Sequence, residues 1–175
     1  MLRMTGTAVW KGVFVNFIVC ADKNWGIGRG QDLLVRIPDD LRLFRRLTEG
    51  KVVVMGRKTR ESLPHGILAD RVNLVLTHDK HYDAGGCICV HSLEDLYDSL
   101  KQYRSEDVFV IGGGSVYRQL ADACSTAYVT KLEAAYDADV YAPDLDELDD
   151  WELAEESEER TYSGLIYYFR KYVKK

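Results

Sequence analysis

The sequence predicts an α/β protein: a mostly parallel central sheet of about eight strands, with helices on both faces and an antiparallel C-terminal edge. Two observations support this class. As far as Ile111, short apolar runs of strand length alternate with helical segments. From residue 126 onward, strand-like segments follow one another without helices between them. The first pattern is typical of parallel strands joined by crossover helices, and the second of antiparallel strands.

Length and charge narrow the possible classes. A chain of 175 residues is long enough for one well-buried domain, so we expect a single domain over residues 13–175, with residues 1–12 as an N-terminal extension. The net charge of −5 argues against nucleic-acid or membrane partners. No long apolar run or leader segment is present, and we therefore expect a cytoplasmic protein. We also expect a monomer.

Cysteine and histidine spacing favours neither disulfides nor a metal site. The four cysteines contain no C-x-x-C pair, which is typical of structural thiols in a reducing compartment. The four histidines show no i, i+4 pair and no grouping with cysteine. We therefore expect no metal ligands.

The first predicted elements are a strand and a glycine-rich segment. Residues 13–21 (VFVNFIVCA) are apolar and rich in β-branched and aromatic types, as in a buried strand. Glycines at 26, 28 and 30 predict a mobile segment over residues 26–31 that could act as a lid. An ordinary flexible connection explains these glycines equally well.

A helix is predicted from Pro38 to Gly50, because proline suits the first helical position and glycine the residue that ends a helix. At about 100° per residue, Asp40 shares a face with apolar positions and Asp39 lies on the opposite, charged face. An isolated carboxylate among apolar groups is costly unless a partner binds it. Its two acceptor oxygens suit two parallel N–H donors, such as an aminopyrimidine edge. Asp40 is therefore the ligand-binding candidate, and Asp39 an ordinary first-turn acid.

The next segments predict an anion site. A strand at 51–55 leads through Gly56 into a short helix that begins with Arg57 and Lys58 and ends before Pro64. Backbone N–H groups gather at such a junction and attract anions. Further strands are expected at 72–77 and 88–90, and Ser92 begins a capping box for a helix to about residue 104.

A second glycine junction follows the strand predicted at 108–111. Three glycines, 112–114, precede a helix at 116–121, so a backbone or a pyrophosphate could approach closely. A sharp turn that needs small residues explains them equally well. Strands are then expected at 126–132 and 139–141, followed by an antiparallel pair at 151–160 and 165–173. Ligands of such sheets bind beyond the carboxyl ends of the parallel strands, where both glycine junctions lie.

With these motifs in order, residues 13–174 resemble the bacterial dihydrofolate reductases. The matching motifs are W-G-I-G (25–28), I-P-D-D-L-x-x-F (37–44), V-V-M-G-R-K-T (53–59), R-V-N-L-V-L-T (71–77), V-I-G-G-G-S-V-Y (110–117), V-T-K-L (129–132) and D-A-D-V-Y-A-P-D (137–144). The resemblance implies reduction of 7,8-dihydrofolate to tetrahydrofolate, in one-carbon metabolism, by hydride transfer to C6 and protonation at N5. It also implies that antifolates bind the protein.

The resemblance assigns substrate-side roles. Asp40 matches the single active-site carboxylate, and Thr130 the hydroxyl that supports it. Arg71 matches the arginine that binds the substrate's glutamate carboxylate. The remaining substrate-binding positions are Ile18, Val19, Cys20, Leu41, Phe44, Leu63, Leu68 and Ile111.

The resemblance also implies NADPH as the cofactor. Arg57 and His78 match positions that bind the phosphates, including the adenosine 2′-phosphate. The full cofactor set is Ile27, Gly28, Gly56, Arg57, Lys58, Thr59, Thr77, His78, Gly112, Gly113, Gly114, Ser115, Val116 and Tyr117.

Three positions depart from the family pattern. Val35 stands where many members have a tryptophan that helps order an active-site water. Ser115 stands where some carry a further cofactor-binding arginine, and Arg60 where some have tryptophan. Two alternatives remain: a pyrimidine reductase of riboflavin synthesis, which would not need Asp40, Thr130 and Arg71 in these places, and a non-catalytic NADPH- or folate-binding module.

Overall fold

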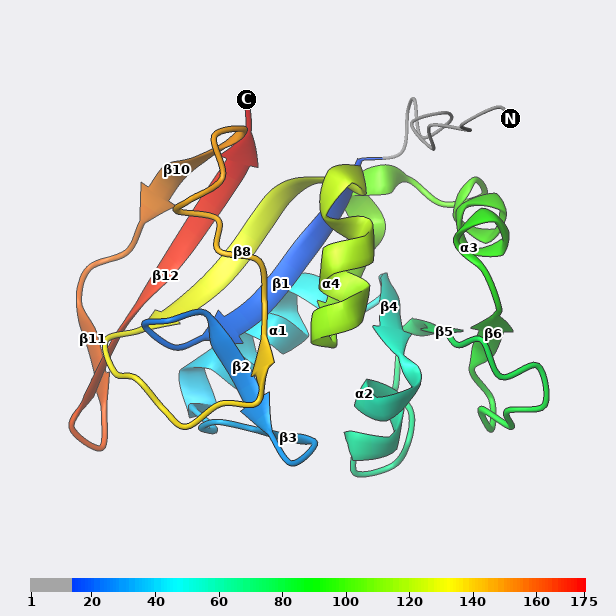
Figure 1. Ribbon diagram of the computed structural model, residues 1–175, viewed down its shortest axis with the longest axis horizontal. Helices are drawn as coiled ribbons and strands as arrows, with labels where there is room; N and C mark the ends of the chain where they lie inside the picture. The colour runs from blue at the N-terminus through cyan, green and yellow to red at the C-terminus, as the bar shows by residue number, and fades with distance from the viewer. Residues whose placement is uncertain (1–13) are drawn as a thin grey trace, which may run out of the picture.

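A nine-stranded sheet forms the centre of the computed structural model, which describes residues 14–175 (Figure 1). The extension expected at residues 1–12 lies outside the described part. The main path of the sheet runs through β10 (Trp151–Glu156), β12 (Leu165–Lys174), β8 (Cys124–Leu132), β1 (Val15–Ala21), β7 (Val108–Gly112), β4 (Val52–Gly56), β5 (Val72–Leu76) and β6 (Ile88–Val90), and β11 (Arg160–Tyr162) pairs with β12 off this path.

Strand direction divides this sheet into two parts. Each neighbouring pair from β8 through β1, β7, β4 and β5 to β6 is parallel. β12 runs antiparallel to β8, and both β10 and β11 run antiparallel to β12. The prediction of a mostly parallel sheet with an antiparallel C-terminal edge is confirmed.

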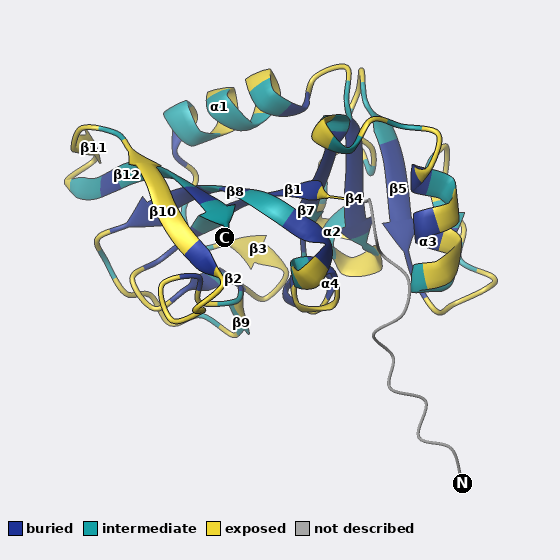
Figure 2. Cartoon of the chain, turned by 90° about the horizontal axis from the view of Figure 1, so that it is seen from above, coloured by how far each residue is buried: buried dark blue, intermediate teal, exposed yellow. Residues whose placement is uncertain are grey.

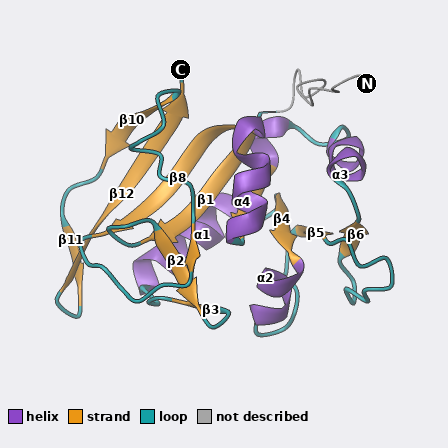
Figure 3. Ribbon diagram, in the orientation of Figure 1, coloured by secondary structure: helices purple, strands orange, loops and turns teal. Residues whose placement is uncertain are grey.

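Helices cover both faces of the sheet, as predicted. They are α1 (Pro38–Thr48), α2 (Arg57–Ser62), α3 (Leu93–Leu100) and α4 (Gly114–Leu120). α1 lies on one face and α4 on the opposite face (Figure 2). Strands and helices alternate as far as α4, and mainly strands follow (Figure 3).

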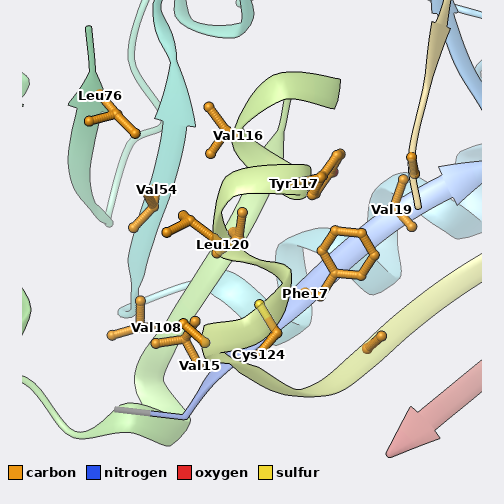
Figure 4. Close-up of a cluster of buried hydrophobic side chains, with 14 of the residues drawn as sticks. Val15, Phe17, Val19, Val54, Leu76, Val108, Val116, Tyr117, Leu120 and Cys124 are labelled. Carbon is orange, nitrogen blue, oxygen red and sulfur yellow. The ribbon is translucent and has the colours of Figure 1, made fainter. Parts of the chain in front are cut away.

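The main core lies between the sheet and α4. Val15 and Phe17 of β1 pack with Val54 of β4 against Leu120 of α4 (Figure 4). The Phe17 ring meets the Tyr117 ring edge-on, with centroids 4.3 Å apart. Because side chains alternate along a strand, residues between these positions point to the α1 side.

The glycine-rich segment is a β-hairpin rather than an irregular connection. β2 (Gly26–Arg29) pairs with β3 (Asp32–Leu33) and with β9 (Val140–Tyr141) in a separate three-stranded sheet. A Cβ at Gly26 would lie 2.6 Å from the Cβ of Ala138, and one at Gly28 would lie 2.8 Å from the Asp32 carbonyl oxygen. These two glycines thus allow close backbone packing.

Two predicted elements are shorter than expected. α3 ends at Leu100 rather than near residue 104, because Tyr103 N donates to the Leu100 carbonyl in a tight turn and the Tyr103 ring packs on the core. The strand predicted at 151–160 is broken after Glu156. There the Ser157 hydroxyl accepts a hydrogen bond from Phe169 N, so a side chain takes the place of part of the backbone ladder.

Candidate active site

A cleft of about 1430 Å³ passes the carboxyl ends of β1, β4, β5 and β7. Cys20, Gly56, Leu76 and Gly112, which lie at or near these strand ends, form part of its wall. The β2–β3 hairpin, α1, α2 and the start of α4 complete it. The cleft therefore occupies the edge of the sheet where ligands were expected.

Most of the predicted site residues line this cleft. On the substrate side these are Ile18, Val19, Cys20, Asp40, Leu41, Phe44, Leu63, Leu68 and Ile111. On the cofactor side the wall contains Ile27, Gly28, Gly56, Arg57, Lys58, Thr59, Thr77, His78, Gly112, Gly113, Gly114, Ser115, Val116 and Tyr117. Thr130 and Arg71 lie outside the wall.

Asp40 reaches the cleft from the first turn of α1. Thr130 of β8, which is only 2% exposed, donates a hydrogen bond of 2.6 Å from Oγ1 to Asp40 Oδ1. Burial raises the pKa of Asp40 above its usual value, and the Thr130 hydrogen bond opposes that shift. The site thus combines a desolvated carboxylate with one fixed donor, leaving its second oxygen available to a ligand.

The Asp40 face of α1 lines the cleft instead of packing fully into the core. Leu41 is 42% exposed, and Phe44 is half-buried. Only the ends of this face are fully enclosed, by Ile37 at 1% and Thr48 at 0% exposure. The predicted apolar stripe therefore lines the cleft at Asp40, Leu41 and Phe44.

Asp39 points away from the cleft, and its carboxylate lies between Arg42 of its own helix and Tyr167 of β12. It forms an ion pair with Arg42, lies 3.8 Å from Arg160 and accepts a hydrogen bond of 3.0 Å from the Tyr167 hydroxyl. The Arg42 hydrogen bond, followed by that of Tyr167, lowers the pKa of Asp39. Adjacent carboxylates therefore have opposite environments.

β1 contributes a buried thiol beside the carboxylate. Cys20 stands opposite Thr130 in the parallel pairing of β1 with β8. Burial, followed by the charge of Asp40, raises the pKa of Cys20 well above its usual value. The thiol is therefore neutral and acts as a small apolar wall. The Ile18 carbonyl nearby accepts a 2.6 Å hydrogen bond from the Tyr117 hydroxyl.

Arg71 lies beside α1 rather than in the cleft wall. Its Nε donates to Thr48 Oγ1 at 3.1 Å, and one terminal nitrogen donates to the Ala69 carbonyl at 2.6 Å. Burial lowers the pKa of Arg71, but a guanidinium retains its charge. These contacts fix the side chain at the end of α1, and its role toward a substrate carboxylate stays a prediction.

The other half of the cleft suits a dinucleotide phosphate. Arg57 and Lys58 begin α2, and Thr77 and His78 follow β5. A Cβ at Gly113 would lie 3.4 Å from Thr59 Oγ1, and Gly112 has a φ of +130°. A basic wall and a side-chain-free turn therefore meet at the cleft, which fits a phosphorylated nicotinamide cofactor.

Several residues that line the cleft were not predicted from the sequence. They include Arg29, Gly30, Gln31, Asp32, Leu33, Arg36, Ser62, Pro64, Asp79, Arg118, Gln119, Asp139, Val140 and Tyr141. The glycines at 26–30 predicted only a flexible segment, because the pairing of this hairpin with β9 joins residues more than one hundred positions apart.

Residues 14–175 contain neither a cluster of metal ligands nor a membrane-spanning helix. No group of three metal-ligating side chains occurs in that part of the chain. Within the same residues, no helix has the length and apolar character needed to cross a membrane.

The comparisons with known proteins agree over nearly the whole chain. The sequence profile described as dihydrofolate reductase matches residues 14–174. The dihydrofolate reductase of Bacillus subtilis (strain 168) is 34% identical over 163 residues, which cover 92% of this chain and 95% of that protein. The chain belongs to the dihydrofolate reductase family. The Neisseria gonorrhoeae dihydrofolate reductase is 33% identical, covering 92% of this chain and 98% of its own.

A solved member of the family has the same fold. The dihydrofolate reductase of Enterococcus faecalis, complexed with NADP(H) and RAB-propyl, superposes with a TM-score of 0.82 at 27% identity. The match covers 92% of this chain and 96% of the solved one. Dihydrofolate reductases are NADPH-dependent oxidoreductases of folate metabolism, and this chain is one of them.

Proposed function

We propose that the chain reduces 7,8-dihydrofolate to 5,6,7,8-tetrahydrofolate with NADPH, and that Asp40 is its catalytic carboxylate. The observation that carries the proposal is the 2.6 Å bond from Thr130 to Asp40 inside a cleft that also has a basic, glycine-lined half. The 2-amino group and the ring N–H of a pterin supply the pair of N–H donors that such a carboxylate accepts.

Asp40 performs two tasks in this account. Its free oxygen orients the pterin by accepting hydrogen bonds, so the ring lies against the Ile18, Cys20 and Phe44 walls. Its negative charge, in a desolvated place, favours protonation of the pterin at N5. In this proposal water would carry the proton to N5.

Bound NADPH supplies the hydride. Arg57, Lys58, Thr77 and His78 would bind its phosphates, including the 2′-phosphate, through charge and hydrogen bonds. Gly112 and Gly113 leave room for the nicotinamide and pyrophosphate to approach the backbone at the β7–α4 turn. These assignments rest on the cleft wall described above.

Arg71 would bind the α-carboxylate of the glutamate tail. The guanidinium is fixed by Thr48 and the Ala69 carbonyl, which leaves further N–H groups for a carboxylate. Residues 13–175 would act as one domain, because the central sheet takes strands from both ends of the chain. A cytoplasmic monomer that binds antifolates fits this account.

The decisive experiment follows NADPH oxidation in the presence of dihydrofolate. Turnover by the wild-type chain, with a loss of at least about 100-fold in Asp40→Asn, is expected for a group that governs proton transfer. Full activity in that variant would refute the role of Asp40. Binding of both ligands without turnover would select a non-catalytic module, and turnover of a ribosylated aminopyrimidine would select the riboflavin-pathway reductase.

A further inference from the structure

We infer that Asp39 and Tyr167 form a positioning pair that fixes the first turn of α1 and thereby the orientation of the Asp40 carboxylate. The inference rests on the role proposed for Asp40. Neither residue lines the cleft, and both act through the helix that carries Asp40.

The start of α1 has little other support of its own. Its N-cap residue, Ile37, contributes no side-chain hydrogen bond to the free N–H groups of the first turn. Pro38 occupies the first helical position. Because the N-cap side chain adds no hydrogen bond, contacts with other elements help to fix where the first side chains of α1 point.

Two adjacent strands provide those contacts. In the antiparallel pair of β12 with β8, Tyr167 stands opposite Leu132 and Phe169 opposite Thr130. Opposed residues share a face of the sheet, and so do residues two apart. Tyr167 and Thr130 therefore project from the same face toward α1, one to Asp39 at 3.0 Å and one to Asp40 at 2.6 Å.

The Tyr167 ring adds packing to its hydrogen bond. The residue is only 1% exposed and shares a buried cluster with Ile37 and Leu132. Val35, which stands where many family members have tryptophan, packs against the same cluster. The tyrosine thus contacts both the residue before the helix and the second residue within it.

Neighbouring positive charges keep Asp39 ionised, so that it accepts the hydrogen bond from the Tyr167 hydroxyl. Arg42 and Arg160 lie beside Asp39, and the Arg160 guanidinium stands over the Phe169 ring at 5.0 Å. Asp39 therefore remains an ionised acceptor and Tyr167 a protonated donor under conditions in which Asp40 titrates. The contact on Asp39 persists whichever form Asp40 takes.

The test measures binding of a 2,4-diaminopyrimidine, a probe whose two donors need a correctly placed Asp40. Tyr167→Phe and Asp39→Ala should each weaken it about five- to tenfold, the loss expected for one hydrogen bond of moderate strength. The double variant should lose no more than either single one, because both remove the same contact. NADPH affinity should stay unchanged, since its proposed site lies at α2 and α4.

Matched variants separate positioning from folding. Asp39→Asn keeps an oxygen that accepts from Tyr167 and should restore most of the affinity, whereas Tyr168→Phe removes an exposed hydroxyl bonded to Glu159 and should change nothing. Additive losses, wild-type affinity in Tyr167→Phe, or Asp39→Asn as weak as Asp39→Ala would each overturn the inference. Wild-type affinity in Asp40→Asn would instead refute the proposed function, and the inference with it.

Discussion

The Thr130 hydroxyl and the Asp40 carboxylate lie 90 positions apart in the chain and 2.6 Å apart in space. Thr130 belongs to β8 of the central sheet, and Asp40 belongs to α1, the helix that follows the β2–β3 hairpin. This contact orients a carboxylate that lines the cleft together with the predicted substrate-binding residues. Removal of this hydrogen bond should therefore weaken the binding and turnover of the substrate more than the binding of the cofactor.

Thr130→Val is expected to lower kcat/KM for dihydrofolate by about tenfold or more, the usual effect of losing a hydrogen bond to a charged group. The Thr130 bond lowers the pKa of Asp40, so its loss should move the pKa seen in the pH profile upward. Steady-state rates across a pH series measure both effects. Thr126→Val on the same strand is the matched control, and a downward shift would contradict the account.

Asp40→Asn should increase stability while it removes activity. Burial raises the folded-state pKa of Asp40 above the ordinary 3.8, so the native fold favours the protonated form. The wild type therefore loses stability relative to the variant as pH rises from 3.8 through the folded-state pKa. The variant is expected to melt about 2–4 °C higher at neutral pH.

The difference in melting temperature between the wild type and Asp40→Asn should depend on pH, and this dependence is a control for the prediction. Well below pH 3.8 Asp40 is protonated in both the folded and unfolded states, and the two melting temperatures should converge. Melting curves at a series of pH values measure this. A variant that is less stable at neutral pH would show that Asp40 contributes to the fold through its charge.

Arg71→Leu should discriminate between ligands with and without a glutamate tail. The loss of a charged hydrogen-bond donor is expected to weaken glutamate-bearing folates about tenfold or more and to leave tail-less diaminopyrimidines nearly unchanged. Dissociation constants for one ligand of each kind measure the difference. Arg46→Leu, an exposed position on α1, is the control. Equal losses for both ligands would argue against the assigned role.

Arg57→Leu tests the cofactor half of the cleft. If this guanidinium binds the 2′-phosphate, affinity for NADPH should fall about tenfold while that for NADH, which lacks the phosphate, stays the same. Arg45→Leu on the solvent side of α1 should alter neither constant. Equal losses of affinity for NADPH and NADH would show that Arg57 binds a part of the cofactor other than the 2′-phosphate.

Local patterns predicted most of the fold and part of the site. Helical periodicity separated Asp40 from Asp39, and the glycine turns at 56 and 112 marked the cleft edge, because these features depend on neighbouring residues. The partners of the two carboxylates were harder to predict. Thr130 followed only from a family resemblance, and Tyr167 was missed, since their positions depend on β12 lying beside β8 in the sheet.

The hairpin at 26–33 illustrates the same limit. Its glycines read locally as flexibility, whereas Gly26 has no space for a side chain because Ala138 lies against it. A contact across more than one hundred positions decides the conformation of this segment. Hydrophobic periodicity reports local structure and does not predict such a contact.

A comparison of NADPH oxidation with dihydrofolate between the wild-type chain and Asp40→Asn, at neutral pH, shows whether Asp40 is the catalytic carboxylate. We expect turnover by the wild type and a loss of at least about 100-fold in the variant, with NADPH affinity preserved. Equal rates in the two proteins would contradict it.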